Sequence, residues 1–318
     1  MKLKNAYLLI AGLLVISSCK NDDDTIGEVV PPRLLSEVTV EDDAEIVEFL
    51  KTHFYNKEEF DAPPEGFDFK IRFDTIAGEN SSKQSLFDSP KLITQSITVD
   101  SEDFGLDDGE KISLKLYLLI AQQGVGGQPT IGDNSFIQYE GLLLDGNLFD
   151  ASANQPARFY LGEPGLRVGF AQAVLKLKTG LGPIENGDGT VSYTDFGVAA
   201  VFMPSGLAYF NQTVSSIPAY SPLVFKLQAL GYEANTDIDG DGIPSILEDL
   251  DGDGDLNNDN TDTELEAING KIPNHFDNDD DGDGILTIDE IELDADGKFV
   301  GFLDTDGDGT PDHLDNDL

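Results

Sequence analysis

The last quarter of the chain most constrains how this protein can fold, because acidic residues crowd there. Residues 237–318 hold 28 of the 61 Asp and Glu residues but only 2 of the 19 Lys and Arg residues of this 318-residue chain. Large apolar residues are too few in this stretch to form a core by burial alone. A compact structure therefore requires a counter-ion. We treat residues 233–318 as a separate acidic unit, called the repeat array below.

Asp and Gly recur at a fixed spacing within the repeat array. An EF-hand-type calcium loop supplies oxygen ligands from positions 1, 3, 5, 7, 9 and 12, with a backbone carbonyl at position 7 and Gly at position 6. The segments starting at Asp237, Asp279 and Asp304 fit this pattern, and the one starting at Asp249 fits except at position 12. The expected calcium ligands are Asp237, Asp239, Asp241, Ile243, Glu248, Asp249, Asp251, Asp253, Asp255, Asp279, Asp281, Asp283, Ile285, Glu290, Asp304, Asp306, Asp308, Thr310 and Asp315.

The loops follow one another without long helices between them, and in this they resemble thrombospondin type 3 repeats. Pro244 and Pro311, two residues after the position-6 Gly, discourage a helix from leaving the loop. Asp294 and Asp296 look like half of a further site. The resemblance implies structural Ca²⁺ whose binding energy is folding energy, with affinities of about 10⁻⁴–10⁻³ M. A disordered acidic tail is the alternative, but it does not explain the recurring Gly.

The N-terminus predicts export. Two lysines precede the apolar stretch YLLIAGLLVI, and Cys19, the only cysteine, follows two serines. The stretch is too short to cross a bilayer, and ISSC resembles a bacterial lipobox, so residues 1–18 are expected to be a signal peptide and Cys19 to be lipidated. An ordinary signal peptide with an incidental cysteine is the alternative. Residues 19–36 are expected to form a tether, and KNDDD either is part of it or resembles an outer-surface sorting signal.

These features predict an outer membrane lipoprotein that faces the periplasm or the cell surface and meets the membrane through its lipid anchor. The net charge of −42 makes nucleic acid an improbable partner, because a polyanion would be repelled.

Residues 37–109 are expected to form a small α/β segment. Thr39 and Asp42 resemble a capping box, and apolar residues recur at helical spacing after them, which predicts an amphipathic helix over residues 40–54 that packs on the neighbouring domain. FDFKIRFDTI and KLITQSITVD alternate like half-buried strands. No residue of this segment indicates catalysis.

Strand-like runs dominate residues 110–232. They begin near residues 111, 134, 158, 196 and 221, and the single helical stretch is AQAVLKLK. Several strands with one helix predict an α+β fold in which an antiparallel sheet curls around a short helix.

The strings YEGLLLDGNLFDAS, FYLGEPGLRVGF, LAYF and LVFKLQAL resemble, in order and spacing, the FK506-binding-protein (FKBP) type of peptidyl-prolyl cis–trans isomerase. The resemblance covers residues 110–232. It implies an isomerase that needs no cofactor for catalysis and acts on proline-containing exported polypeptides. Its site would be an apolar bowl lined by Tyr139, Phe149, Asp150, Phe159, Leu166, Arg167, Phe170, Tyr209, Ile217 and Phe225.

Two departures from the family pattern keep alternatives open. Arg167 stands where the family has isoleucine, and Ala157 stands where it has an aromatic residue. Residues 179–193 are an insertion whose NGDG predicts a hairpin turn. The alternatives to catalysis are a chaperone that binds peptides without isomerising them and a calcium-stabilised structural or adhesive surface protein.

Overall fold

The computed structural model describes residues 31–152, 155–262 and 272–316. The chain divides into two units, Met1–Pro32 and Arg33–Leu318, and the elements below belong to the second. The expected signal peptide and Cys19 lie outside the described residues. Within the described ranges, no helix is both long and apolar enough to cross a bilayer.

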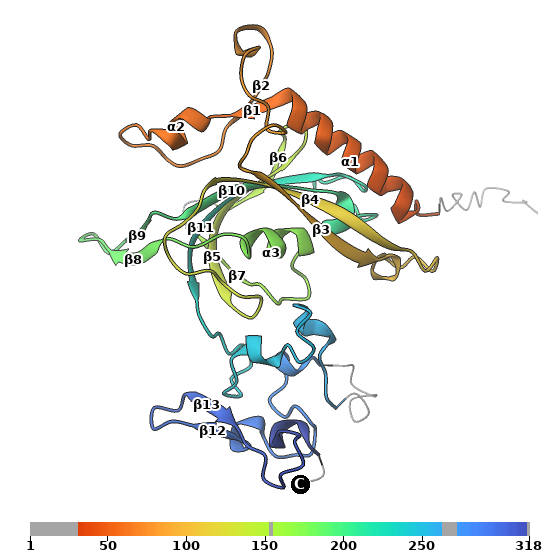
Figure 1. Ribbon diagram of the computed structural model, residues 1–318, viewed down its shortest axis with the longest axis vertical. Coiled ribbons are helices and arrows are strands. Elements are labelled where there is room, and N and C mark those ends of the chain that lie inside the picture. The colour runs from red at the N-terminus through yellow and green to blue at the C-terminus, as the bar shows by residue number, and fades with distance from the viewer. Residues whose placement is uncertain (1–30, 153–154, 263–271, 317–318) are drawn as a thin grey trace, which may run out of the picture. The chain divides into compact units, whose positions relative to one another are not determined.

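A seven-stranded antiparallel sheet forms the centre of the larger unit (Figure 1). Its strands are β3 (Leu92–Asp100), β4 (Lys111–Gln122), β5 (Asn134–Leu143), β6 (Leu148–Ala151), β7 (Ala157–Tyr160), β10 (Gly197–Met203) and β11 (Leu223–Glu233). They run in the order β3-β4-β10-β11-β5-β6, and β7 also pairs with β5. The five strands predicted from residue 111 onward are confirmed. β3 pairs with β4 along its whole length, so the sheet crosses the expected boundary at residues 109 and 110. We call residues 92–233 the sheet domain.

Both faces of the central strands are buried. In β10, Val201 and Met203 belong to one apolar cluster, whereas Ala200 and Phe202 belong to the other. Successive side chains of a strand point to opposite faces, so a strand that is covered on both sides reads as a continuous apolar run. This explains the sequence GVAAVFM, in which every residue is buried.

The short helix α3 (Val168–Val174) covers one face of the sheet, which curves around it (Figure 1). Phe170, Ala173 and Val174 are buried there in a cluster that includes Leu227 of β11. The helix begins three residues before the predicted stretch, at Val168. The predicted mixture of an antiparallel sheet with few helices is confirmed.

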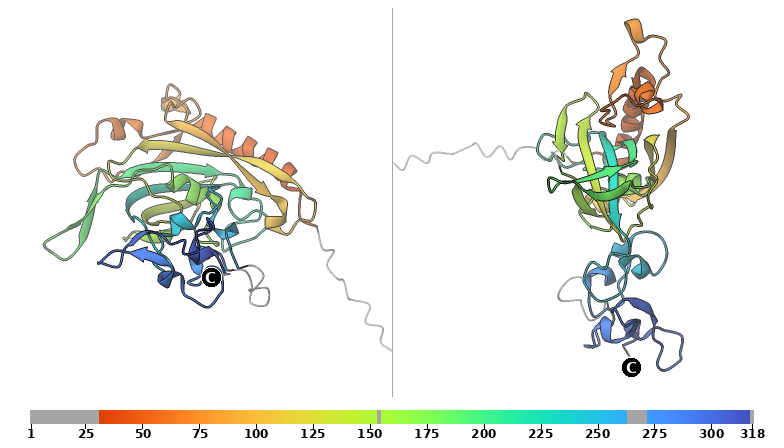
Figure 2. Two further views of the ribbon diagram at one scale, coloured as in Figure 1. Left: turned by 60° about the horizontal axis from the view of Figure 1, so that its bottom comes forward. Right: turned by 90° about the vertical axis from the view of Figure 1, so that its left-hand side faces the viewer.

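Helix α1 (Leu35–Thr52) covers the opposite face of the sheet (Figure 2). Ile46 and Leu50 are fully buried there in the cluster that contains Phe202, so the predicted packing is confirmed. The predicted start after Thr39 is wrong, because the Thr39 hydroxyl donates 2.7 Å to the carbonyl of Leu35 inside the helix.

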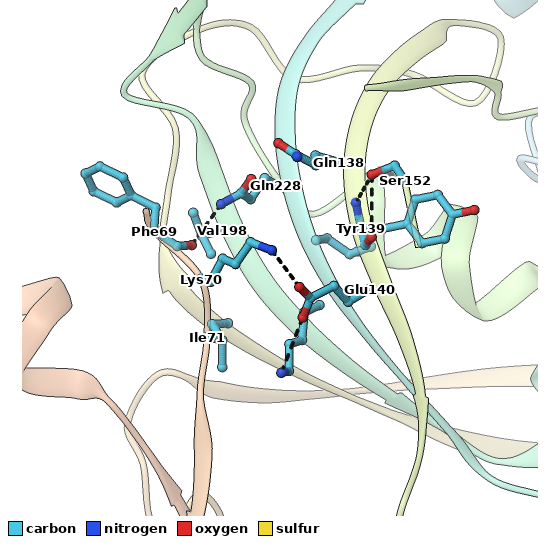
Figure 3. Close-up of a pocket in the computed structure, with 11 residues that line it drawn as sticks. Phe69, Lys70, Ile71, Gln138, Tyr139, Glu140, Ser152, Val198 and Gln228 are labelled. Carbon is cyan, nitrogen blue, oxygen red and sulfur yellow. Dashed lines mark hydrogen bonds and ion pairs between the residues drawn. The ribbon is translucent and has the colours of Figure 1, made fainter. Parts of the chain in front are cut away.

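The rest of the N-terminal segment forms short elements: β1 (His53–Tyr55), α2 (Lys57–Asp61) and β2 (Phe73–Thr75). The strand predicted over FDFKIRFDTI is wrong except at its end. The Gln228 amide nitrogen donates 3.0 Å to the carbonyl of Asp68 and 3.0 Å to that of Phe69, acceptors that a neighbouring strand would otherwise use. Figure 3 shows Gln228 beside Phe69. Lys70 reaches Glu140 at 2.7 Å, so this segment is tied to the outer face of the sheet (Figure 3).

The insertion after α3 forms the predicted hairpin, with strands β8 (Leu181–Glu185) and β9 (Val191–Thr194). Its turn uses Gly189 at a φ of +83°, a conformation that favours glycine.

In its described residues, the repeat array contains short 3₁₀ turns and one hairpin, β12 (Ile291–Leu293) with β13 (Phe299–Phe302). Asp294 accepts hydrogen bonds from the backbone of Asp296 and Lys298 in the turn of this hairpin. Asp294 and Asp296, which look like half of a further site, therefore lie in this turn.

Direct contacts join the repeat array to the sheet domain. The backbone N–H of Asn134 donates 3.0 Å to the Thr236 hydroxyl, and the Asn257 amide donates 3.2 Å to the carbonyl of Gly162. The ring centroids of Tyr160 and His275 lie 5.8 Å apart. Burial lowers the pKa of His275 to about 4, so the imidazole at this contact is neutral.

Candidate functional sites

A hollow of about 110 Å³ opens between the curved sheet and α3. We call it the bowl, and its lining residues are Tyr139, Asp150, Phe159, Gly165, Leu166, Arg167, Phe170, Tyr209 and Phe225. Eight of the ten residues implied by the family resemblance are therefore brought together. They come from β5, β6, β7, α3 with the segment before it, β11 and the loop after β10. Gly165 was not predicted to line the bowl, because a glycine has no side chain from which a role in the lining could be inferred.

Aromatic rings form the floor and walls of the bowl. Phe170 is 3% exposed, and its ring centroid lies 4.8 Å from Phe159, 5.4 Å from Phe225 and 6.0 Å from Tyr139. The contacts with Phe225 and Tyr139 are edge-to-face, the arrangement that aromatic quadrupoles favour. The floor is thus a fixed apolar surface.

Phe149 and Ile217, the other two expected residues, lie outside the lining. Phe149 packs edge-to-face on Phe225 at 5.4 Å, and its ring occupies the space that a side chain at Gly141 would need. Ile217 is 3% exposed and belongs to the core. Phe149 therefore supports the bowl through its contact with Phe225. The hairpin of residues 181–194 does not contribute to its lining either.

One acidic residue, Asp150, and one basic residue, Arg167, interrupt the apolar lining. The Tyr139 hydroxyl donates 2.7 Å to Asp150, and burial together with this hydrogen bond raises the pKa of Tyr139 to about 12. The Arg167 guanidinium lies 4.9 Å over the ring of Tyr209 and donates to the carbonyls of Ala208, at 3.2 Å, and Gly165, at 2.6 Å. Carbonyls, rather than a carboxylate, are the acceptors that the structure describes for Arg167.

Four groups of carboxylates gather in the repeat array, one in each predicted loop. Within each group, one carboxylate oxygen from each residue lies within 4.8 Å of the others. The groups are Asp237, Asp239 and Asp241; Asp249, Asp251 and Asp253; Asp279, Asp281 and Asp283; and Asp304, Asp306 and Asp308. The first three expected ligands of each loop are thus brought together.

The same local geometry builds all four loops. In each, the position-5 carboxylate accepts a hydrogen bond from the backbone of position 7, as Asp241 does from Ile243 at 2.7 Å. The position-6 glycines have a φ between +84° and +104°. This left-handed conformation is strained for other residues, which explains why Gly recurs at position 6.

A fifth group joins two loops. Carboxylate oxygens of Asp241, Glu248 and Asp280 lie within 4.8 Å of one another, and all three residues are buried. In the described structure, both oxygens of Glu248 and both of Asp280 are buried without a hydrogen-bond partner. Burial and the neighbouring carboxylates raise the pKa of Glu248 to about 11 and that of Asp280 to about 9. Buried carboxylates without donors are the environment that a bound cation stabilises.

Other expected ligands differ in their surroundings. Glu290 is buried near the group at Asp279, and burial raises its pKa to about 7. Asp255 is exposed, and its carboxylate accepts from the backbone of Asn257, so its side chain caps a 3₁₀ turn. Asp280, at position 2 of its loop, was not expected.

The curved sheet, its short helix and the aromatic bowl define an α+β domain with a largely apolar hollow. Residues 126–182 match the family model of the FKBP-type peptidyl-prolyl cis-trans isomerases. FK506-binding protein 1A of Neurospora crassa is 31% identical over 120 residues, which cover 36% of this chain and 87% of the fungal protein. The chain therefore belongs to the FKBP-type peptidyl-prolyl cis-trans isomerase family.

Longer bacterial relatives match in part. A probable FKBP-type peptidyl-prolyl cis-trans isomerase FkpA of Neisseria meningitidis is 35% identical over 134 residues, 40% of this chain and 43% of that protein. FkpA of Aeromonas hydrophila is 32% identical over 116 residues, 36% of this chain and 37% of that protein. The chain thus spans less than half the length of these two relatives.

Two solved structures match part of the chain. A peptidyl-prolyl cis-trans isomerase from Pseudomonas syringae has a TM-score of 0.32 at 22% identity. The match covers 46% of this chain and 84% of the Pseudomonas chain. FkpA from Escherichia coli has a TM-score of 0.32 at 20% identity, with 62% and 63% covered.

Proposed function

We propose that the bowl binds proline-containing segments of polypeptides and catalyses their cis–trans isomerisation. The observation that carries this proposal is the gathering of eight expected residues around one hollow. Rotation about a peptide bond must break amide resonance, at a barrier of ~18–20 kcal/mol. Water stabilises the planar, charge-separated amide, so a site that excludes water and fits the twisted amide lowers the barrier without covalent chemistry.

The family resemblance assigns a role to each wall. Phe170 and Phe225 would hold the proline ring on the floor, and the Tyr209 hydroxyl would donate a hydrogen bond to a substrate carbonyl. The backbone N–H of Arg167 would hold a second carbonyl. The Arg167 guanidinium supports the position of Tyr209 by lying over its ring at 4.9 Å.

The cis-to-trans rate of a short X–Pro peptide, measured with the full chain, tests this proposal. Tyr209→Phe should lower kcat/KM by about tenfold, since it removes one hydrogen bond to the reacting amide. Tyr193→Phe, in the β8–β9 hairpin away from the bowl, is the matched control and should leave the rate unchanged. A folded chain that binds the peptide without accelerating its isomerisation would contradict catalysis and would favour the peptide-binding chaperone.

We also propose that the repeat array binds structural Ca²⁺ and that catalysis itself needs no cofactor. The buried Glu248 and Asp280, whose oxygens lack donors in the described structure, support this, as does the recurring loop geometry. Calcium would replace the missing donors and offset the charge of the array. Calorimetric titration should show saturable calcium binding that Glu248→Gln weakens by at least about tenfold. An unchanged titration would contradict this ligand assignment.

We further propose that the chain is exported as an outer membrane lipoprotein and assists the folding of other exported proteins. The support is the sequence around Cys19, with its preceding apolar stretch. Cells fed a labelled fatty acid should incorporate the label into the wild-type chain but not into Cys19→Ser. Membrane fractionation of the same two strains tests the anchor, and equal incorporation would contradict lipidation at Cys19.

A further inference from the structure

A second hollow, of about 450 Å³, lies beside the bowl and has no role in the function proposed above. We call it the side groove. One wall comes from β3 with the start of α3, and the other comes from the second loop of the repeat array. Leu166 lines both the bowl and the side groove, so the two hollows are adjacent.

The floor of the side groove is apolar. Leu161, Val99 and Ala171 are buried there, and Val168 of α3 remains 46% exposed. Covering an exposed apolar side chain on the wall of a hollow favours binding of a partner, because apolar surface is removed from water. The floor therefore suits apolar side chains of a bound chain.

The rim of the side groove is acidic. Its ionisable lining residues are four aspartates and one lysine, and the lysine, Lys111, is already paired with Asp100 at 3.0 Å. Asp253 is a proposed calcium ligand, so a bound ion would offset its charge. Asp103 on the sheet side and Asp255 on the array side are both exposed on the rim. The rim thus complements a cation.

The array wall is fixed to the sheet domain at this place. Leu256 is fully buried and would touch a side chain at Gly162, and the Asn257 amide donates 3.2 Å to the Gly162 carbonyl. Asp255, directly before them, is therefore held on the rim. The repeat array supplies one wall of the side groove.

We propose that the side groove binds the part of a substrate polypeptide that flanks the proline, and that it selects segments with an apolar residue followed by Lys or Arg. This inference rests on the proposed function of the bowl, because it assumes that the proline lies there. Adjacency through Leu166 and the acidic rim are the observations that carry it.

Two peptide lengths separate this inference from the function of the bowl. A short X–Pro peptide reports on the bowl alone. Peptides with about six residues on each side of the proline span about 20 Å per side when extended, enough to leave the bowl. These long peptides carry either Lys or Glu, placed on each side of the proline in turn. Binding is measured by fluorescence anisotropy and turnover by the isomerisation rate, with the full chain in millimolar calcium.

The Lys peptide should bind about three to ten times more tightly than the Glu peptide on one side of the proline, as expected for a few exposed charge pairs. Asp103→Lys should remove most of this preference. Asp103→Asn, which keeps an acceptor for the backbone N–H of Asp100, should reduce it about twofold. Asp107→Lys makes the same charge change in the same loop, at a residue that does not line the side groove, and should leave the preference intact.

The outcomes of these measurements distinguish the side groove from the function of the bowl. Equal binding of the Lys and Glu peptides, or an equal effect of Asp103→Lys and Asp107→Lys, would overturn the inference, because the preference would then reflect net charge alone. Turnover of the short peptide with no preference among long peptides would leave the bowl's function standing. A preference among long peptides without any turnover would support the side groove and contradict catalysis.

Discussion

Buried residues differ between the sheet domain and the repeat array. On the concave side of the sheet they are apolar, as in the cluster of Phe170, Leu227 and Val201. In the array the buried residues include Asp241, Glu248 and Asp280. Apolar burial needs nothing from outside the chain, whereas burial of like charges costs free energy unless a cation offsets it. Removal of metal should therefore destabilise the repeat array and leave the sheet domain largely unchanged.

Asp42, a buried carboxylate in the helix that packs on the sheet, can be compared directly with Glu248 of the repeat array. Asp42 of α1 is 3% exposed, and it accepts hydrogen bonds from the backbone N–H and the hydroxyl of Ser205, at 2.7 and 2.6 Å. Glu248 is 2% exposed, and neither of its oxygens has such a donor within the described residues. Hydrogen-bond donors from the protein thus stabilise the buried carboxylate of Asp42, whereas the buried carboxylate of Glu248 would need a bound ion.

Removal of calcium is the largest perturbation of this comparison. In chelator we expect the backbone amides of residues 237–316 to lose nearly all protection from hydrogen exchange, because carboxylate repulsion is no longer offset. The strands β4, β10 and β11 should keep theirs, since their core is apolar. Exchange measured by mass spectrometry with and without calcium checks this. Equal loss in both regions would break the comparison and show that the sheet needs the array.

Truncation of the bowl floor should have the next largest effect. Phe170→Ala should lower the free energy of unfolding by about 3–5 kcal/mol and turnover by more than about tenfold, because it removes a buried ring that also lines the bowl. Phe202→Ala is the matched control, since Phe202 is equally buried but lies on the other face of the sheet. It should cost similar stability and keep turnover while folded. Equal loss of turnover in the two folded variants would contradict the role of the floor.

Alternation and loop spacing made much of this molecule predictable, and tertiary contacts explain what was missed. The main strands were predicted because their apolar patterns are local. Thr39 and Asp42 looked like a helix start, but Asp42 binds Ser205, 163 positions away in the sequence. Asp280 sits at a loop position that supplies no ligand in the sequence pattern, and its proximity to Glu248 arises only when two loops pack. The bowl could be predicted through resemblance, whereas the side groove depends on the docking of the array.

The pH dependence of stability tests the contrast between the two kinds of buried carboxylate. Burial raises the pKa of Asp42 from 3.8 to about 6, so the folded chain holds this proton more tightly than the unfolded chain. The contribution of Asp42 to stability is therefore fully present below pH 4 and is lost as the pH rises through about 6. Asp42→Asn stays neutral and still accepts from Ser205. Its free energy of unfolding should exceed the wild-type value by about 1–3 kcal/mol at pH 8 and equal it near pH 4.

Urea unfolding at the two pH values, in saturating calcium, measures this difference. Glu45→Gln removes one charge from an exposed position of the same helix and should change stability by less than about 0.5 kcal/mol. A variant at Asp42 that is equally destabilised at both pH values would show that the carboxylate charge strengthens the contact with Ser205.

The smallest expected effect concerns the one cation in the bowl. Arg167 donates to two carbonyls and leaves its charge available to a substrate, so an acidic residue next to the proline should be favoured over a basic one by about twofold to fivefold. Arg167→Met keeps an unbranched side chain over Tyr209 without the charge and should abolish this preference in kcat/KM. Arg158→Met, which removes a cation that is paired with Glu233 outside the bowl, should preserve it. If both variants lose the preference equally, the net charge of the whole chain sets the preference for an acidic residue. The charge of Arg167 in the bowl would then make no contribution to it.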